Sequence, residues 1–257
     1  MTPPVFLGDR AELESDRFTL AGPEGRHATT VRRLGLGERV DVTDGNGLLV
    51  HCEVVGVRPG ELELAVLARN VEVAPACRVV VVQAILKGDR GELAVELMTE
   101  VGVDEIVPWA AQRCVARWRP GREDKALARW RSTAREAAKQ SRRARFPVVT
   151  DQADTAGVVA RAATLGRAGL VLLLDPDASR RLADVELPRD GEIALIVGPE
   201  GGLGESETSE LVAAGALPVR LGPSVLRGST AGAVAAALVL SGCGRWQDLP
   251  PRATGSS

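Results

Sequence analysis

Short runs within the first 70 residues alternate between apolar and polar positions with the period of two that is typical of half-buried strands, and strands are expected at Glu38–Thr43 and Leu48–Val55. In the run Leu48–Val55 apolar side chains recur at every second position, and the run Glu61–Val66 repeats the pattern. Before the first run stands Asp44–Gly47, which reads Asp-Gly-Asn-Gly, a composition that tolerates positive φ and favours a hairpin turn. The pattern predicts a small β-rich domain over residues 1–70, either a barrel or a half-open sheet.

From residue 78 onward the alternation gives way to apolar runs separated by stretches with helical periodicity. The run Val79–Leu86 is almost wholly apolar, as expected of a strand that is buried on both faces. Strands that alternate with helices predict an α/β domain with a parallel sheet. We expect strands at 79–86, 105–109, 147–150, 170–175, 192–197 and 217–221, and helices at 92–101, 123–141, 155–165, 205–214 and 226–242.

These patterns divide the chain into a first domain at 1–70, a linker at 71–76, a second domain at 77–245 and a tail at 246–257. The linker contains Pro75, and the end of the tail is expected to be disordered. The four cysteines lie far apart, with no CxxC or Cys/His cluster, so we expect buried thiols and no metal site. The N-terminus shows no signal-peptide pattern, and the longest apolar run, Ala231–Leu240, is too short to span a bilayer, which predicts a cytoplasmic protein.

The charge of the chain is unevenly distributed. The net charge is −2, but residues 112–145 hold twelve Arg or Lys against three acids, a local charge of +9. In the helix predicted there, Arg131, Arg135, Lys139 and Arg142 form one stripe at spacings of four, four and three. Such a stripe can follow a phosphate backbone, which favours RNA contact, although a merely solvated helix face gives the same pattern.

Three segments in the last third carry candidate chemistry. Gly198–Gly202 (Gly-Pro-Glu-Gly-Gly) follows an apolar strand, Leu221-Gly222 ends a second one, and Leu226–Ala231 opens an alanine-rich helix. A glycine-rich turn after a strand lets backbone groups approach a ligand closely. Glu200 and the acids at 205 and 207 argue against a phosphate ligand, because they compete for the positive end of the helix. Taken singly, the segments also fit a tight turn, a strand exit and a core helix.

In this order and spacing the segments resemble the SPOUT class of RNA methyltransferases, and most closely the ribosomal RNA small subunit methyltransferase E family. The resemblance covers nearly the whole chain. Its most specific piece is the segment 135–142, which reads Arg-Glu-Ala-Ala-Lys-Gln-Ser-Arg. The other matching segments are 27–33, 37–40, 44–47, 87–90, 99–103, 106–108, 198–202, 221–222 and 226–231.

The resemblance implies methylation, by S-adenosylmethionine (AdoMet), of N3 of a decoding-region uridine in 16S rRNA, family target uridine 1498, on the small ribosomal subunit. It also implies a PUA-like N-terminal domain, a deep trefoil knot in the C-terminal fold, and a homodimer with the cofactor cleft at its interface. No metal is implied. AdoMet carries a sulfonium cation and no phosphate, so an acidic loop lined by backbone groups suits it. A target base that pairs or stacks is expected to be extruded into the cleft.

Candidate residues follow from the matching segments. The implied cofactor-binding residues are Leu174, Gly198, Pro199, Glu200, Gly201, Gly202, Leu221, Gly222, Leu226, Ser229, Thr230 and Ala231. Arg227 is the implied catalytic cation, placed to stabilise negative charge on the uracil. The candidates for RNA contact are Arg10, Arg26, His27, Arg32, Arg33, Lys87, Arg131, Arg135, Lys139 and Arg142. Taken alone, His27 equally fits a structural hydrogen-bonding role.

One departure from the family pattern bears on function. The family reads Leu-Arg-Thr-Glu-Thr-Ala where this chain reads Leu226–Ala231 as Leu-Arg-Gly-Ser-Thr-Ala, so Ser229 replaces an acid. The sequence therefore names no general base. Two alternatives stay open: a SPOUT enzyme that methylates a ribose 2′-hydroxyl or another base, and a catalytically weak RNA-binding or ribosome-assembly protein. Ser229 or Thr230 is expected to cap the last helix, and Gly204 the helix after the glycine loop.

Overall fold

The computed structural model describes residues 2–118 and 121–247, so the segment 248–257 of the predicted tail lies outside the described residues. The chain forms two compact units. The first unit comprises Met1–Ala74 with Arg135–Phe146, and the second comprises Pro75–Ala134 with Pro147–Ser257. The first break along the chain thus falls inside the expected linker, where β5 ends at Val71 and β6 begins at Cys77.

The first unit is built on a five-stranded sheet of order β1-β3-β4-β5-β2. The expected hairpin is confirmed: β3 and β4 pair in antiparallel register, and the Asp44 Oδ1 atom between them accepts the backbone N–H groups of Asn46 and Leu48. Alternate side chains of β4 and β5 are buried in one core, as their period predicts. The elements are β1 Val5–Leu7, α1 Arg10–Leu13, β2 Arg17–Leu20, α2 Gly22–Arg26, the π-helix His27–Val31, β3 Arg39–Thr43, β4 Leu48–Arg58 and β5 Glu61–Val71.

The segment 135–146 belongs to the first unit although residues 75–134 of the second unit separate it from residue 74. The Phe146 N–H donates to the Gly45 carbonyl at 2.8 Å, and the Thr43 hydroxyl donates to the Ala144 carbonyl at 3.1 Å. The Arg145 guanidinium donates to the Glu72 carbonyl at 2.7 Å. The prediction of a first domain ending at residue 70 missed this segment, because alternation along a chain carries no information about partners so far away.

The second unit has a seven-stranded sheet of order β12-β10-β11-β6-β7-β8, with β9 also paired to β7. Every pairing in it is parallel, as predicted. The carboxyl ends of its strands therefore lie along one edge. The strands are β6 Cys77–Ala84, β7 Glu105–Ala110, β8 Val148–Val149, β9 Ala153–Asp154, β10 Leu170–Leu174, β11 Gly191–Val197 and β12 Leu217–Val219.

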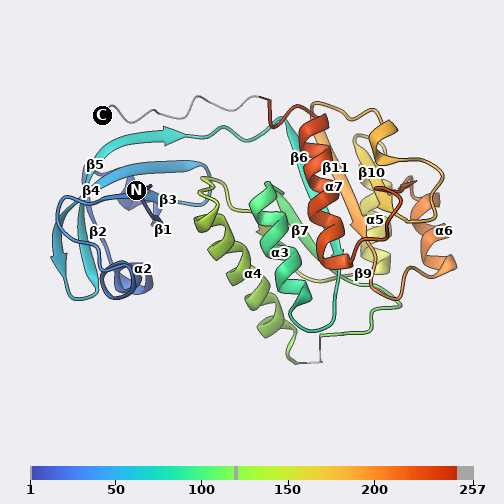
Figure 1. Ribbon diagram of the computed structural model, residues 1–257, viewed down its shortest axis with the longest axis horizontal. Coiled ribbons are helices and arrows are strands. Elements are labelled where there is room, and N and C mark those ends of the chain that lie inside the picture. The colour runs from blue at the N-terminus through green and yellow to red at the C-terminus, as the bar shows by residue number, and fades with distance from the viewer. Residues whose placement is uncertain (1, 119–120, 248–257) are drawn as a thin grey trace. The chain divides into compact units, whose positions relative to one another are not determined.

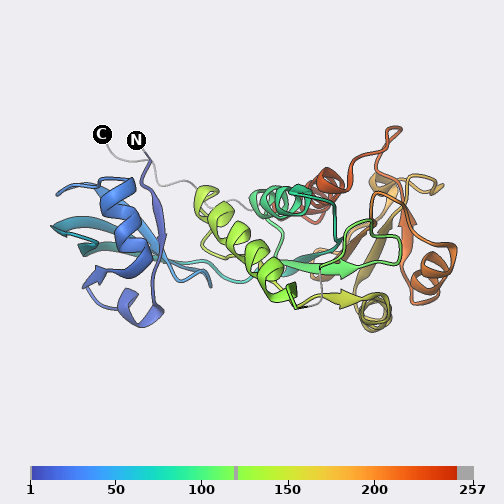
Figure 2. The same cartoon turned by 90° about the horizontal axis from the view of Figure 1, so that it is seen from below.

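Helices cover both faces of this sheet (Figures 1 and 2). The helices α3 (Arg90–Val101), α7 (Gly228–Gly242) and the start of α4 (Glu123–Gln140) pack on one face, while α5 (Thr155–Leu165) and α6 (Glu205–Ala213) pack on the other. In β6, Val79 and Val81 join the first core and Val80 and Val82 the second. The expectation of a strand buried on both faces is confirmed. The deep knot stays a prediction.

The cysteines are buried thiols, as expected. Burial raises the pKa of Cys52 to about 12 and that of Cys77 to about 12, which keeps both in the unreactive thiol form. Within residues 2–118 and 121–247, every helix is too short or too polar to cross a lipid bilayer.

Candidate active site

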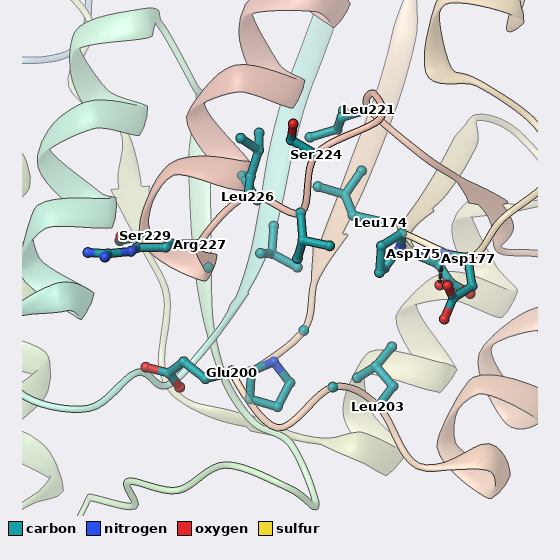
Figure 3. Close-up of a pocket in the computed structure, with 18 of the residues that line it drawn as sticks. Leu174, Asp175, Asp177, Glu200, Leu203, Leu221, Ser224, Leu226, Arg227 and Ser229 are labelled. Atoms are coloured by element: carbon teal, nitrogen blue, oxygen red, sulfur yellow. Dashed lines mark hydrogen bonds between the residues drawn. The ribbon is translucent and has the colours of Figure 1, made fainter.

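A pocket of about 600 Å³ opens at the carboxyl edge of the second unit's sheet (Figure 3). Its floor is made by the last residues of three parallel strands: Leu174 of β10, Val197 of β11 and Val219 of β12. Its walls are the loops that follow these strands and the first turn of α7. Ligands of open α/β sheets bind at this edge, and the volume lies within the range of small-molecule sites.

The glycine loop forms the wall that follows β11. Gly202 has φ of +69°, a conformation that L side chains rarely adopt, and its N–H donates to the Pro199 carbonyl to close a turn. A Cβ on Gly201 would stand 3.1 Å from the Arg113 carbonyl oxygen, so a larger residue there would displace the backbone. The loop ends where Gly204, in extended conformation, caps α6 as predicted. The glycines are thus required by backbone geometry, which leaves main-chain groups open to the pocket.

The acid of this loop is anchored to the start of the α3 region. One Glu200 oxygen accepts the Lys87 backbone N–H at 3.3 Å and lies 3.5 Å from the Arg90 guanidinium. Glu200 therefore joins two separate segments at the pocket wall. The Lys87 side chain itself is exposed, as an RNA contact would require.

Helix α7 begins at Gly228, two residues earlier than a Ser229 cap and three earlier than a Thr230 cap would allow. Arg227 occupies the N-cap in extended conformation, and no side chain caps the helix. The prediction that Ser229 or Thr230 caps α7 is wrong: Ser229 lies inside the first turn, 3% exposed, and the Thr230 hydroxyl donates to the Arg227 carbonyl. The first backbone N–H groups of α7 consequently lack a side-chain acceptor at the pocket wall.

The Arg227 side chain is exposed and lines the pocket. Within the described residues its guanidinium makes no ion pair or hydrogen bond. Figure 3 shows Arg227 and Ser229 on one side of the pocket, opposite Asp175 and Asp177. An unpaired cation at one wall and two carboxylates at the other make the pocket electrostatically polar.

The pocket contains ten of the twelve predicted cofactor residues, and Gly201 and Thr230 are not among its lining residues. Sequence reasoning missed Arg90, Asp175, Asp177, Ser224 and Val225, which also line it. Asp175 accepts the Asp177 N–H at 2.9 Å, so the turn after β10 holds both carboxylates in place. Their position immediately after a buried strand was the available signal, since ligands bind where such strands end.

The four cations predicted to form an RNA-contacting stripe on α4 do not form one exposed surface. Lys139 contradicts it outright: its side chain is 4% exposed, and its ammonium lies 3.0 Å from Glu24 and 2.9 Å from Glu136. A buried and paired ammonium group is not accessible to an RNA phosphate. Helical spacing placed Lys139 on a polar face correctly but could not show that α2 of the first unit covers that face.

The other stripe members differ in their freedom. Arg131 donates to the Val149 carbonyl at 3.0 Å and to Asp151 at 2.9 Å, which holds it against β8. Arg142 has φ of +59° and donates to the Pro3 carbonyl. Arg135 is exposed, and within the described chain nothing pairs with it. The opposite, apolar face of α4 is buried as predicted, with Trp130 2% exposed.

In the first unit the predicted segment 27–33 has an unusual backbone. It contains a π-helical turn in which the Arg32 N–H donates to the His27 carbonyl, followed by Arg33 with φ of +54°. Arg26, Arg32 and Arg33 are exposed, whereas the His27 ring packs edge-on against Phe6. Such turns and left-handed residues cluster at functional sites.

Arg10 and His51 of the first unit are each bound to an acidic side chain. Arg10 is partly tied, with its guanidinium 2.9 Å from Asp44. The His51 ring bridges Asp41 at 2.6 Å and Asn70 at 3.0 Å across three strands, a partner set that the sequence did not reveal. Among the described residues no group of three or more His, Cys, Asp or Glu side chains could hold a metal ion.

Comparison with known proteins places this architecture in a family. Two family models match the chain: an RNA methyltransferase domain over residues 73–240, and an RNA methyltransferase PUA domain over residues 20–67. A Mycobacterium bovis protein named ribosomal RNA small subunit methyltransferase E is 46% identical over 226 residues, which cover 88% of this chain and 86% of that protein. The chain belongs to the ribosomal RNA small subunit methyltransferase E family. The Bacillus subtilis member is 26% identical over 227 residues, or 85% of this chain and 87% of that protein.

Solved structures agree with the fold. A Neisseria gonorrhoeae ribosomal RNA small subunit methyltransferase E bound to S-adenosyl methionine has a TM-score of 0.82 at 26% identity, covering 93% of this chain and 98% of that one. A methyltransferase structure from Legionella pneumophila, at 24% identity, has a TM-score of 0.80 and covers 94% of this chain and 98% of that one, which supports the fold. The family resemblance and the α/β fold with an N-terminal PUA domain are confirmed.

Proposed function

We propose that this protein transfers the methyl group of AdoMet to N3 of a uridine in 16S rRNA, acting on the small ribosomal subunit. Membership of the methyltransferase E family supports the RNA substrate class. The observation that carries the proposal is the pocket at the carboxyl edge, whose lining combines the unpaired Arg227 with carboxylates and glycine backbone.

The residues present fit AdoMet. Leu174, Val197 and Leu221 offer apolar walls to an adenine ring, and the loop 198–202 offers backbone groups to its polar edge. Asp175, Asp177 and Glu200 offer negative charge to a molecule that carries a sulfonium and an ammonium group. Bound AdoMet supplies an electrophilic methyl group. The described residues that line the pocket include no cluster of cations of the kind that would bind a phosphate instead.

Uridine N3 is a poor nucleophile until its proton leaves, so the site must stabilise the uracil anion. We assign this role to Arg227, because its guanidinium is exposed at the pocket wall and free of other partners among the described residues. A fixed cation at the developing charge on O2 or O4 lowers the barrier by about 3 kcal/mol. Because it stabilises the anion, Arg227 also makes the proton easier to lose.

No side chain is assigned as the proton acceptor. Ser229 stands where the family pattern has an acid, and a serine hydroxyl does not accept a proton near neutral pH. We infer that the N3 proton leaves to solvent. This makes the reaction depend on pH through the uridine itself.

RNA contact is assigned to exposed cations of each unit. In the first unit these are Arg26, Arg32 and Arg33, which flank the π-helical turn, together with Arg10, Arg135 and Arg142. The half-buried His27 ring stays a candidate for contact through its ring nitrogens. In the second unit they are Lys87 and Arg131. Lys139 is excluded, because its ammonium is buried and paired.

We also propose that the protein is a homodimer. Val234 and Leu238 lie four residues apart on α7 and are 40% and 44% exposed. Together on one helix face they support the proposal, because contiguous exposed apolar residues are typical of surfaces that another chain covers. Light scattering at two protein concentrations tests this, and a monomeric mass at both would contradict it.

One alternative has an observation in its favour. Ser229 in place of the acid fits a protein that binds the subunit and transfers methyl groups weakly. Methyl transfer from tritiated AdoMet to small subunits that lack the modification separates the two, and nucleoside mass spectrometry also distinguishes N3 from a ribose or another base. Recovery of 3-methyluridine supports the proposal, whereas subunit binding without AdoMet affinity supports the alternative.

A further inference from the structure

A second cavity, of about 450 Å³, lies in the second unit and is separate from the active-site pocket. It is formed where β7 ends, where β9 ends and where α5 begins. None of its lining residues belongs to the first pocket. They are Ala110, Gln112, Arg117, Trp118, Gln152, Asp154, Thr155 and Ala156.

Both cavities open at the same edge of one sheet. β7 runs parallel to β6, and β6 runs parallel to β11, whose end forms the floor of the active-site pocket. The segment that lines the second cavity is also bonded to the glycine-loop region. The Arg113 guanidinium donates to the Leu203 carbonyl at 3.2 Å, and the Gln112 N–H donates to the Glu207 carboxylate at 3.1 Å. A polymer lying along this edge would therefore meet both cavities.

The walls of the second cavity combine an aromatic ring with unused amides. Trp118 lines it and is fixed edge-to-face against the buried Trp130, at a centroid distance of 5.5 Å. Gln112 and Gln152 are exposed, and within the described residues neither side-chain amide makes a hydrogen bond. Arg117 adds one cation and Asp154 one anion, so the cavity has little net charge.

This chemistry suits a planar, neutral heterocycle with donors and acceptors on its edge. Sequence-specific recognition of RNA uses splayed-out bases that stack on aromatic rings or guanidinium planes and bond to amides through their edges. We propose that the second cavity binds an unstacked nucleobase of the RNA substrate, a neighbour of the base that enters the active site. The proposal rests on the proposed RNA methyltransferase function.

A buried network holds the cavity in shape. Glu207 is fully buried, and its Oε1 accepts both the Gln112 N–H and the Thr155 hydroxyl, the latter at 2.6 Å. The Trp109 indole N–H donates to the same hydroxyl at 3.4 Å. Among the described residues the second carboxylate oxygen of Glu207 has no hydrogen-bond partner, so this buried group costs stability where it stands. This carboxylate braces two cavity walls and so gives a preformed site.

The test uses the full-length protein and small ribosomal subunits that lack the methyl group. The double variant Gln112→Ala/Gln152→Ala removes both amides without touching a bonded atom, and Gln247→Ala, an exposed glutamine elsewhere, is the matched control. The KM for subunits is expected to rise about tenfold in the double variant, with kcat and calorimetric AdoMet affinity unchanged. Trp118→Phe should keep the KM for subunits close to the wild-type value, because it keeps an aromatic ring. Trp118→Leu should raise the KM.

An unchanged KM in the double variant overturns the proposal, as does a loss confined to kcat or AdoMet affinity. Binding of labelled 16S rRNA, measured by filter retention without cofactor, separates a failure of the base-subsite proposal from a failure of the proposed methyltransferase function. If the wild type binds RNA but transfers no methyl group, the proposed function fails. Filter retention of RNA then alone decides whether the second cavity binds a base. Weaker retention of the double variant than of Gln247→Ala supports a base subsite, and equal retention refutes it.

Discussion

The Lys139 ammonium lies 3.0 Å from the Glu24 carboxylate, with the lysine side chain 4% exposed, and this pair holds the end of α4 to α2 across 115 residues of sequence. A cation that the sequence assigned to RNA is thus a structural element of the first unit. The segment 135–146 adds four net positive charges to a domain whose residues 1–74 carry a net charge of −4. Part of the basic block therefore balances acids within the protein.

Breaking this pair should destabilise the first unit. Lys139→Met leaves Glu24 partly buried and without its main partner. We expect the free energy of unfolding to fall by about 3 kcal/mol. This is the lower end of the range for a broken buried pair, because the Glu24 side chain keeps some exposure. Urea unfolding followed by circular dichroism measures it. Arg135→Ala, an exposed cation one turn earlier, is the control and should change stability by less than about 0.5 kcal/mol. Equal losses in the two variants would contradict the structural role.

Arg227 should act on the rate and not on cofactor affinity. Arg227→Ala removes the cation assigned to the uracil anion, and kcat is expected to fall about 10²- to 10³-fold. Calorimetric titration with AdoMet should give an affinity close to that of the wild type. Arg167→Ala removes an exposed arginine at the opposite edge of the sheet and should leave kcat unchanged. Full turnover by Arg227→Ala would remove this residue from the mechanism.

The missing acid at position 229 predicts a particular pH dependence. If the N3 proton leaves to solvent, log kcat of the wild type should keep rising with pH from 6 to 9, with no plateau near neutrality. Ser229→Glu places a carboxylate at the pocket wall and should raise kcat at pH 7 by at least about tenfold. Ser229→Gln has the same size without a base and should not. An equal gain in kcat in both variants would show that the carboxylate does not act as a proton acceptor at position 229.

Two glycines of the pocket provide a test of backbone strain. Gly202 has φ of +69° and Gly222 does not lie in the left-handed region, while an added Cβ meets nothing within 4 Å at either position. Gly202→Ala should therefore cost about 1–2 kcal/mol of stability through conformation alone and weaken AdoMet binding. Gly222→Ala should have little effect. Thermal unfolding with and without AdoMet measures both, and indistinguishable variants would show that the loop does not need its turn.

Local patterns predicted the elements whose partners lie close in sequence or whose burial is complete. Alternation gave the strands β4 and β5, the turn composition at 44–47 gave the β3–β4 hairpin, the apolar run 79–86 gave β6, and helical spacing gave α4 within one residue of its bounds. The glycine loop was found because its composition reflects backbone geometry, which Gly202 illustrates. These features are encoded by side chains within a few residues of each other.

What the sequence did not predict depends on distant partners. Whether the polar face of α4 meets water or α2 is decided by the fold of residues 1–74, so Lys139 was misassigned. Asp175 and Asp177 acquire their place from the pairing of β10 with β11 and β12, and the bridge from His51 to Asp41 and Asn70 needs three strands in register. The start of α7 at Arg227 reflects packing of the first turn, which overrides the preference of serine and threonine for caps.

The proposed uridine-N3 methylation is tested most directly by methyl transfer from tritiated AdoMet to small ribosomal subunits that lack the modification, followed by nucleoside mass spectrometry and mapping by reverse-transcription stops. We expect 3-methyluridine at a single 16S rRNA position, with the label lost in Arg227→Ala. Label on a ribose or another base, or none at all from a folded protein that binds AdoMet, would contradict it.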